Sequence, residues 1–149
     1  MTFSIIKKAA FSALTATALF AAVPAAACPW GNTANVNIGG WNNSTGVGQA
    51  GCLNRTEVLQ QGWNNSIIAT QDGALNTTVV GQNGGWNSSN SSQQGWNNTV
   101  GVAQIGNGNS ADTSQFGDNN VTGVIQIGDG NSASVNTAGS GNTAVVIQY

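Results

Sequence analysis

Polar and apolar positions alternate along the chain in short segments that recur every eleven residues from Asn32 onward. In residues 98–104 (NTVGVAQ), the first, third, fifth and seventh side chains share one face of an extended strand, because successive side chains point to opposite faces. That face begins with Asn, ends with Gln and carries small or β-branched residues between them, so we expect it to be buried. The other face consists mainly of Ser, Thr, Gly and similar residues, which suit contact with water. Each segment therefore predicts a strand of seven residues.

Three residue types stay in phase with this period through the chain. The Asn column comprises Asn32, Asn43, Asn54, Asn65, Asn76, Asn87, Asn98, Asn109, Asn120, Asn131 and Asn142. The Gln column, six residues later, comprises Gln49, Gln60, Gln71, Gln82, Gln93, Gln104, Gln115, Gln126 and Gln148, with Ile38 and Thr137 at its two exceptions. The turn glycines, two residues further on, are Gly40, Gly51, Gly62, Gly73, Gly84, Gly95, Gly106, Gly117, Gly128 and Gly139.

The four residues after each strand predict a tight turn, because Gly, Asn and Asp adopt the positive φ values that such turns need. Two strands and two turns then form a 22-residue rung. Because a two-stranded piece is marginal in water, the rungs must stack to bury their apolar face. The fold class expected is all-β: a flat β-solenoid of cross-β type built from 11-residue half-repeats. Stacked rungs place identical residues about 4.7–4.8 Å apart.

Stacking also explains why amides occupy the face that is to be buried. Buried amides are costly unless they are paired, and a column of identical amides can satisfy each member through the one above and the one below. We therefore predict that the Asn and Gln columns form ladders along the stack.

The N-terminal residues have the pattern of a secretory signal peptide. Lys7 and Lys8 precede an apolar run over residues 9–23, and small residues end at Ala27, where cleavage is expected. The run is shorter than the roughly 20 residues that a membrane anchor needs, and Thr15, Thr17 and Pro24 interrupt it. The predicted organisation is a signal peptide over 1–27, a short lead over 28–31 and a repeat domain of eleven strands over 32–149.

Charge and composition exclude several function classes. Removing residues 1–27 leaves Arg55 as the single basic residue against five acidic ones, so no basic patch is present for nucleic acid or an anionic membrane. The sequence has no His, and its two cysteines and scattered carboxylates form neither a catalytic triad nor a zinc motif. We expect no enzymatic activity, no cofactor and no metal site.

Several units look like curlin repeats, in which Ser or Asn, Gln, Gly, Asn, Ala and Gln recur through strand–turn–strand units. The resemblance rests on segments such as 109–120 and 131–133 and on the closing pair Gln148 and Tyr149, and it is strongest after Asn98. The family alternates Ser-led and Asn-led strands, whereas every strand here begins with Asn. The terminal pair is more similar to the major subunit of curli fibres than to the minor nucleator.

This resemblance implies a structural subunit of extracellular, curli-type amyloid fibres used in biofilm matrix, surface adhesion and cell aggregation. Such a subunit is exported through the periplasm of a Gram-negative bacterium and a dedicated outer-membrane pore, and it polymerises with itself on a nucleator. The residues also point to self-assembly, because the last strand, 142–148, is apolar and has no visible cap. The alternatives are a nucleator or cell-surface anchor of such fibres, and a monomeric β-solenoid that binds sugar or ice.

Aromatic residues and cysteines suggest two further features. Trp41, Trp63 and Trp96 fall in turn phase and are either adhesive aromatics for a polysaccharide or matrix surface, or covers for the turns, which we favour. Cys28 and Cys52 are candidates for a disulfide between neighbouring rungs, with lipidation of Cys28 as the alternative. Residues 87–93 place only polar side chains inward and predict the weakest rung.

Overall fold

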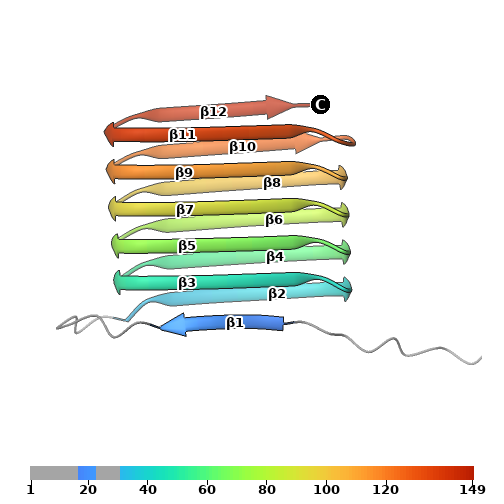
Figure 1. The fold of residues 1–149 in the computed structure, drawn as a ribbon, viewed down its shortest axis with the longest axis horizontal. Coiled ribbons are helices and arrows are strands. Elements are labelled where there is room, and N and C mark those ends of the chain that lie inside the picture. The colour runs from blue at the N-terminus through green and yellow to red at the C-terminus, as the bar shows by residue number, and fades with distance from the viewer. Residues whose placement is uncertain (1–16, 23–30) are drawn as a thin grey trace, which may run out of the picture.

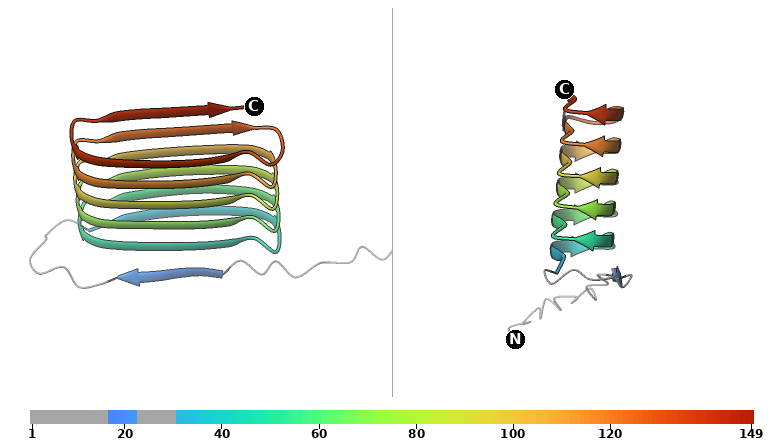
Figure 2. Two further views of the ribbon diagram at one scale, coloured as in Figure 1. Left: turned by 45° about the horizontal axis from the view of Figure 1, so that its top comes forward. Right: turned by 90° about the vertical axis from the view of Figure 1, so that its left-hand side faces the viewer.

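The chain folds into a β-solenoid of two flat parallel sheets, which the computed structural model describes for residues 17–22 and 31–149 (Figure 1). The chain alternates between the sheets, so that consecutive strands face each other and every second strand is paired (Figure 2). One sheet, here called the even sheet, has the order β12-β10-β8-β6-β4-β2, and the odd sheet has the order β1-β3-β5-β7-β9-β11. The fold class predicted from the repeat is therefore confirmed.

The strand bounds follow the repeat. In the even sheet they are β2 (Thr33–Trp41), β4 (Arg55–Trp63), β6 (Thr77–Gly85), β8 (Thr99–Asn107), β10 (Val121–Ile127) and β12 (Thr143–Gln148). In the odd sheet they are β1 (Thr17–Ala22), β3 (Ser44–Cys52), β5 (Ser66–Ala74), β7 (Ser88–Trp96), β9 (Ser110–Asp118) and β11 (Ser132–Ser140).

Most strands have nine residues rather than the seven expected, because pairing between rungs continues through the glycine column. Each strand from β2 to β12 starts one residue after the Asn column. The corner between strands is two residues long, except between β10 and β11, where it has four. The first corner residue often has a positive φ even where it is bulky, as in Leu53 (55°), Leu75 (60°) and Trp86 (55°). The sharp reversal therefore needs left-handed backbone at the glycine and again at the corner.

Strand β1 lies within the residues that we predict to be the signal peptide. It pairs in parallel with β3, from Thr17 opposite Ser44 to Ala22 opposite Gln49. The rest of the predicted signal peptide and most of the predicted lead lie outside the described residues, so the division at residue 27 stays a prediction. In the described ranges, no helix has the length and apolarity needed to cross a bilayer.

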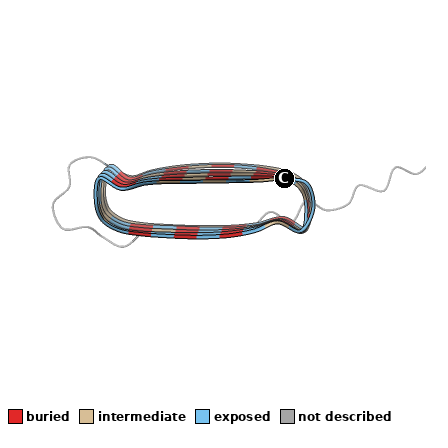
Figure 3. Cartoon of the chain, turned by 90° about the horizontal axis from the view of Figure 1, so that it is seen from above, coloured by how far each residue is buried: buried red, intermediate tan, exposed pale blue. Residues whose placement is uncertain are grey.

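The core is a single layer of side chains between the two sheets, and each rung contributes one level to it. Burial alternates along each strand, as Figure 3 shows, and the buried positions are those that the sequence pattern assigned inward. The apolar part is a stack of small and β-branched residues, including Val58, Val80, Val100 and Val124, all at most 1% exposed. Because each core residue sits over its equivalent 22 residues away, the two sheets keep a constant separation.

The outward faces of the two sheets differ in a way that the repeat did not indicate. On the odd sheet they are mostly polar, as expected, with columns such as Ser44, Ser66, Ser88, Ser110 and Ser132. On strands β6 to β12 of the even sheet, the expectation of a water-suited face is wrong. Large apolar residues are exposed there, including Ile105 (51%), Ile127 (48%) and Val145 (62%).

Strand β7 has polar side chains at both of its central inward positions. Ser89 and Ser91 occupy its two central inward positions, and both are buried. The Ser89 hydroxyl is the one buried side-chain oxygen or nitrogen in the described residues that has no hydrogen-bond partner. The Ser91 hydroxyl accepts a hydrogen bond from Thr113 Oγ1 at 3.0 Å.

We predict that Ser89→Ala raises the free energy of unfolding by about 1 kcal/mol, because it removes a buried hydroxyl that makes no hydrogen bond. Urea unfolding of freshly diluted monomer, followed by far-UV circular dichroism, would measure the change. Ser91→Ala is the matched control and should destabilise the chain, because it removes the Thr113 contact. Equal effects of the two substitutions would contradict this account of the rung.

Candidate functional site

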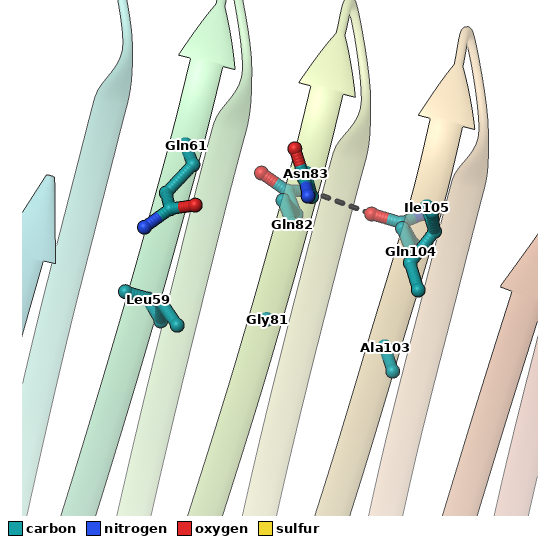
Figure 4. A pocket seen from close by; sticks show the side chains of 8 residues that line it. All are labelled: Leu59, Gln61, Gly81, Gln82, Asn83, Ala103, Gln104 and Ile105. Atoms are coloured by element: carbon teal, nitrogen blue, oxygen red, sulfur yellow. Dashed lines mark hydrogen bonds between the residues drawn. The ribbon is translucent and has the colours of Figure 1, made fainter. Parts of the chain in front are cut away.

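The Gln column forms two continuous hydrogen-bonded ladders inside the solenoid. In the even sheet, the Nε2 of each Gln donates to the Oε1 of the Gln one rung further on, over 2.7–3.0 Å, from Gln60 through Gln82, Gln104 and Gln126 to Gln148. Figure 4 shows the step from Gln82 to Gln104. In the odd sheet, the same bonds join Gln49, Gln71, Gln93 and Gln115.

Each Gln side chain also bonds across the core to the facing strand. Gln82 Nε2, for example, donates to the backbone oxygen of Ser66 at 3.1 Å. One amide group therefore links its own sheet along the stack and the two sheets to each other. The odd-sheet ladder ends at Gln115, because position 137 is Thr. Gln115 Nε2 still donates to Thr122 Oγ1, as Gln49 and Gln71 do to Thr56 and Thr78.

The Asn column is arranged differently from the ladder that we expected. Most Asn side chains bond to backbone rather than to the next Asn side chain. Asn65 Oδ1 accepts the backbone N–H of Asn87 at 3.0 Å, and Asn65 Nδ2 donates to the Gly84 oxygen at 3.0 Å. Side-chain bonds between Asn residues occur in addition at Asn98, Asn120 and Asn142, each at 3.1 Å to the Asn before it in the column.

This arrangement makes each Asn a staple between the corners of two rungs. The corner residues cannot all bond within a regular sheet, and the short Asn side chain supplies the missing donor and acceptor. The full column is buried from Asn43 to Asn120, at most 3% exposed. Asn and Gln therefore differ in role: the Asn side chains hold the corner backbone of successive rungs together, and the Gln side chains hold successive strands and the two sheets together.

The glycine column is required by how closely the rungs approach. A Cβ on Gly84 would lie 1.9 Å from the backbone oxygen of Gly106, and Gly84 has a φ of +126°. The same crowding recurs at Gly40, Gly51, Gly62, Gly73, Gly95, Gly106 and Gly117. Each backbone oxygen that excludes a Cβ in this column also accepts a hydrogen bond from an Asn side chain. The Gly84 oxygen, for example, accepts one from Asn65 Nδ2.

Three of the tryptophans contact each other at one corner of the solenoid. Trp41 and Trp63 stack with ring centroids 6.3 Å apart, and Trp86, which we did not count with them, meets Trp63 edge-on at 5.8 Å. Gly85 leaves room for this, because a Cβ there would lie 2.6 Å from the Trp63 ring. Trp41 and Trp86 remain 56% and 62% exposed, so adhesion and turn covering both stay predictions for this group. Trp96 ends β7 in the other sheet, so it lies away from this group.

Cys52 ends β3 and is disulfide-bonded. Cys28 lies outside the described residues, so its pairing with Cys52 stays a prediction. In the described part of the chain, His, Cys, Asp and Glu residues form no group of three that could hold a metal ion. The notable chemistry of this chain is thus the repeated amide and glycine geometry.

These features define a cross-β solenoid of stacked strand–turn–strand units. The family model of the curlin associated repeat matches residues 106–136 and 117–149, the part of the chain where the resemblance is strongest. The chain carries curlin repeats, and its resemblance to the curlin family is confirmed. No curated protein matches the chain at a significant level.

We predict that Gln82→Leu lowers the free energy of unfolding by about 2–4 kcal/mol. It leaves Gln104 Oε1 without its donor and removes one partner of Gln60 Nε2, and each unsatisfied buried group costs roughly 1–3 kcal/mol. Urea unfolding of the monomer would measure the loss. Gln61→Leu, one position away on the outward face, is the control and should change stability little.

We predict that Gly84→Ala prevents the solenoid from closing at that corner and costs more than about 3 kcal/mol, because its methyl group would overlap the Gly106 oxygen and its φ is positive. Gly101→Ala is the control: a Cβ there meets nothing within 4 Å, and the change should be neutral or stabilise by up to about 1 kcal/mol. Circular dichroism and unfolding curves compare the two. A stable, folded Gly84→Ala variant would contradict the close approach.

Proposed function

We infer that the chain is a structural subunit of extracellular curli-type amyloid fibres that contribute to biofilm matrix, surface adhesion and cell aggregation. Curlin repeats are found in a family of self-assembling fibre subunits, and the chain carries them. The observation that supports this function most is the in-register stacking of identical residues every 22 positions. A second copy has the same spacing and the same columns, so it can continue the stack without any new kind of contact.

The strand edges of the solenoid suit such an addition. Among the described residues, no strand pairs with the outer edges of β11, β12 and β2. Just before β12, the backbone oxygen of Asn142 accepts a hydrogen bond from the N–H of Val121 in β10. Because alternate residues of a strand point to opposite edges, Thr143, Val145 and Ile147 direct their N–H and C=O groups away from β10. These groups form an unpaired template for another strand.

The other end of the odd-sheet ladder also has an unused group. Oε1 of Gln71, Gln93 and Gln115 each accept a hydrogen bond from the preceding Gln. Among the side chains that the structure describes, Gln49 donates hydrogen bonds through Nε2 and none is accepted by its Oε1. Strand β1 pairs with the backbone of β3 at this end, and cleavage of the predicted signal peptide would remove that strand. The amide column can then extend into a neighbouring copy.

The resemblance also suggests partners for such a subunit: further copies of itself, an outer-membrane secretion pore and a nucleator. A nucleator or cell-surface anchor would share these columns, and the lipid state of Cys28 distinguishes it from a bulk subunit. A monomeric solenoid that binds sugar or ice receives less support. Its regular outward Thr column would have to include Thr77, Thr99 and Thr143, which Arg55 and Val121 interrupt.

The proposed function is tested by diluting denatured chain without residues 1–27 into buffer at micromolar concentration. We expect thioflavin T fluorescence to rise after a lag, preformed fibres to abolish the lag, and fibre diffraction to show reflections near 4.7–4.8 Å and 10 Å. A chain that remains monomeric for days under these conditions would refute the function.

We predict that Val145→Pro slows fibre elongation at least tenfold while the monomer still folds. The proline removes an N–H that points away from β10, so pairing within the chain is kept and pairing with the next copy is blocked. Seeded thioflavin T kinetics measure elongation, and circular dichroism reports the fold. Val145→Ala is the matched control, because it shortens the side chain and keeps the N–H. Equal elongation rates for the two variants would contradict growth at this edge.

A further inference from the structure

The outward face of the even sheet is apolar from β6 to β12, and none of the intramolecular contacts described above covers it. The residues that define it, here called the even-sheet apolar face, are Val79, Ile105, Ile125, Ile127, Val145 and Ile147. They are 39–62% exposed. An apolar surface of this kind on an exported protein normally marks a contact with another molecule.

Charge separates this face from the rest of the surface. Strands β6, β8, β10 and β12 contain no charged residue. On the odd sheet, Asp72 and Asp112 point outward and are exposed. Two odd sheets brought face to face would therefore place like charges opposite each other. Two even sheets in contact through β6 to β12 would bury no charged residue.

The face also has relief that matches its own side chains. Gly101 and Gly123 lie between Val79 and Val145 in one column and leave a groove of about 330 Å³. A second hollow of about 190 Å³ lies at Gly81, between Leu59 and Ala103 (Figure 4). Ile125 and Ile147 form a ridge in the column that also contains Gly81. Two such faces related by a twofold axis can place the ridge of each in the groove of the other.

We propose that solenoids of this protein pair laterally through the even-sheet apolar face, with a second copy as the partner. A second solenoid has the same axial repeat, so its ridge meets the groove once per subunit along the contact. A partner with a different period would match at only a few positions. The pair would be a dry, interdigitated contact between two sheets about 10 Å apart.

The size of the face indicates when this pairing occurs. Four strands and three outward positions on each cover roughly 400 Å² per copy, about half of what one partner buries in a standard stable interface. Two isolated monomers would therefore not remain paired. In a fibre, the face recurs with every subunit and the contact area grows with length. The proposal thus rests on fibre formation, the proposed function above.

The experiment compares fibres of the wild-type chain, lacking residues 1–27, with fibres of Ile125→Lys/Val145→Lys. The control is Ser114→Lys/Ser134→Lys, which puts the same charges at the equivalent repeat positions of the odd sheet, where both serines are exposed. Mass per length from scanning transmission electron microscopy counts the solenoids in each fibre, and thioflavin T kinetics report growth separately. We expect paired solenoids in the wild type and the control, and half that mass per length in the even-sheet variant.

Each other outcome decides the matter. An even-sheet variant that remains paired, or wild-type fibres with the mass of one solenoid, would overturn the lateral contact while leaving the proposed function intact. Single wild-type filaments that float with phosphatidylcholine vesicles would assign the face to a lipid surface and overturn the proposal as well. If the lysines prevent growth, Ile125→Ser/Val145→Ser, which copies the odd-sheet residues, provides the same measurement. A wild-type chain that forms no fibres would refute both proposals.

Discussion

The structure depends on hydrogen bonding between identical amides in successive rungs. A buried Gln is costly in most cores, because its two donors and its acceptor oxygen cannot all find partners there. Here the partner of each Gln is another Gln 22 residues away, together with a backbone oxygen on the facing strand. This requirement fixes the register of the sheets, since a shift by one residue would leave the amides of a whole ladder unpaired. A chain with little apolar core thereby specifies one alignment.

The glycine column and the amide ladders depend on each other. The corner backbone has to pass within a distance that excludes a Cβ, as between Gly84 and the Gly106 oxygen. That approach places the Gly106 oxygen where the Asn87 side chain can donate to it. A larger residue would separate the corners and also lengthen the Gln bonds of the adjacent strands. The recurrence of three residue types every eleven residues is therefore one geometric constraint seen at three positions.

The sequence predicted the features that the amide and glycine columns impose, and few of the features that those columns do not determine. The rung length, the parallel stacking and the inward positions all follow from the period, because the burial of an amide column allows one arrangement. The nine-residue strands and the Asn contacts to backbone were not foreseen, because both depend on the path of the corner. Pattern alone also could not show that Trp86 joins Trp41 and Trp63, since that contact depends on the space left by Gly85. Strand β1 was missed because residues 17–22 do not carry the repeat.

The difference between the two outward faces shows where the repeat stops determining the residue. Inward positions are nearly the same in both sheets, because each has to fit between the same neighbours above, below and opposite. Outward positions meet no such requirement. Asp112, Ser114 and Ser134 on the odd sheet correspond in the repeat to Gly123, Ile125 and Val145 on the even sheet. Backbone pairing along the axis is the same in both sheets and an amide ladder runs inside each, so the outward asymmetry contributes nothing to stacking. Its physical effect is confined to contacts at right angles to the axis. It makes the even side from β6 to β12 more apolar than the odd side, where exposed residues such as Ile68 and Phe116 stand among Ser, Asn and Asp.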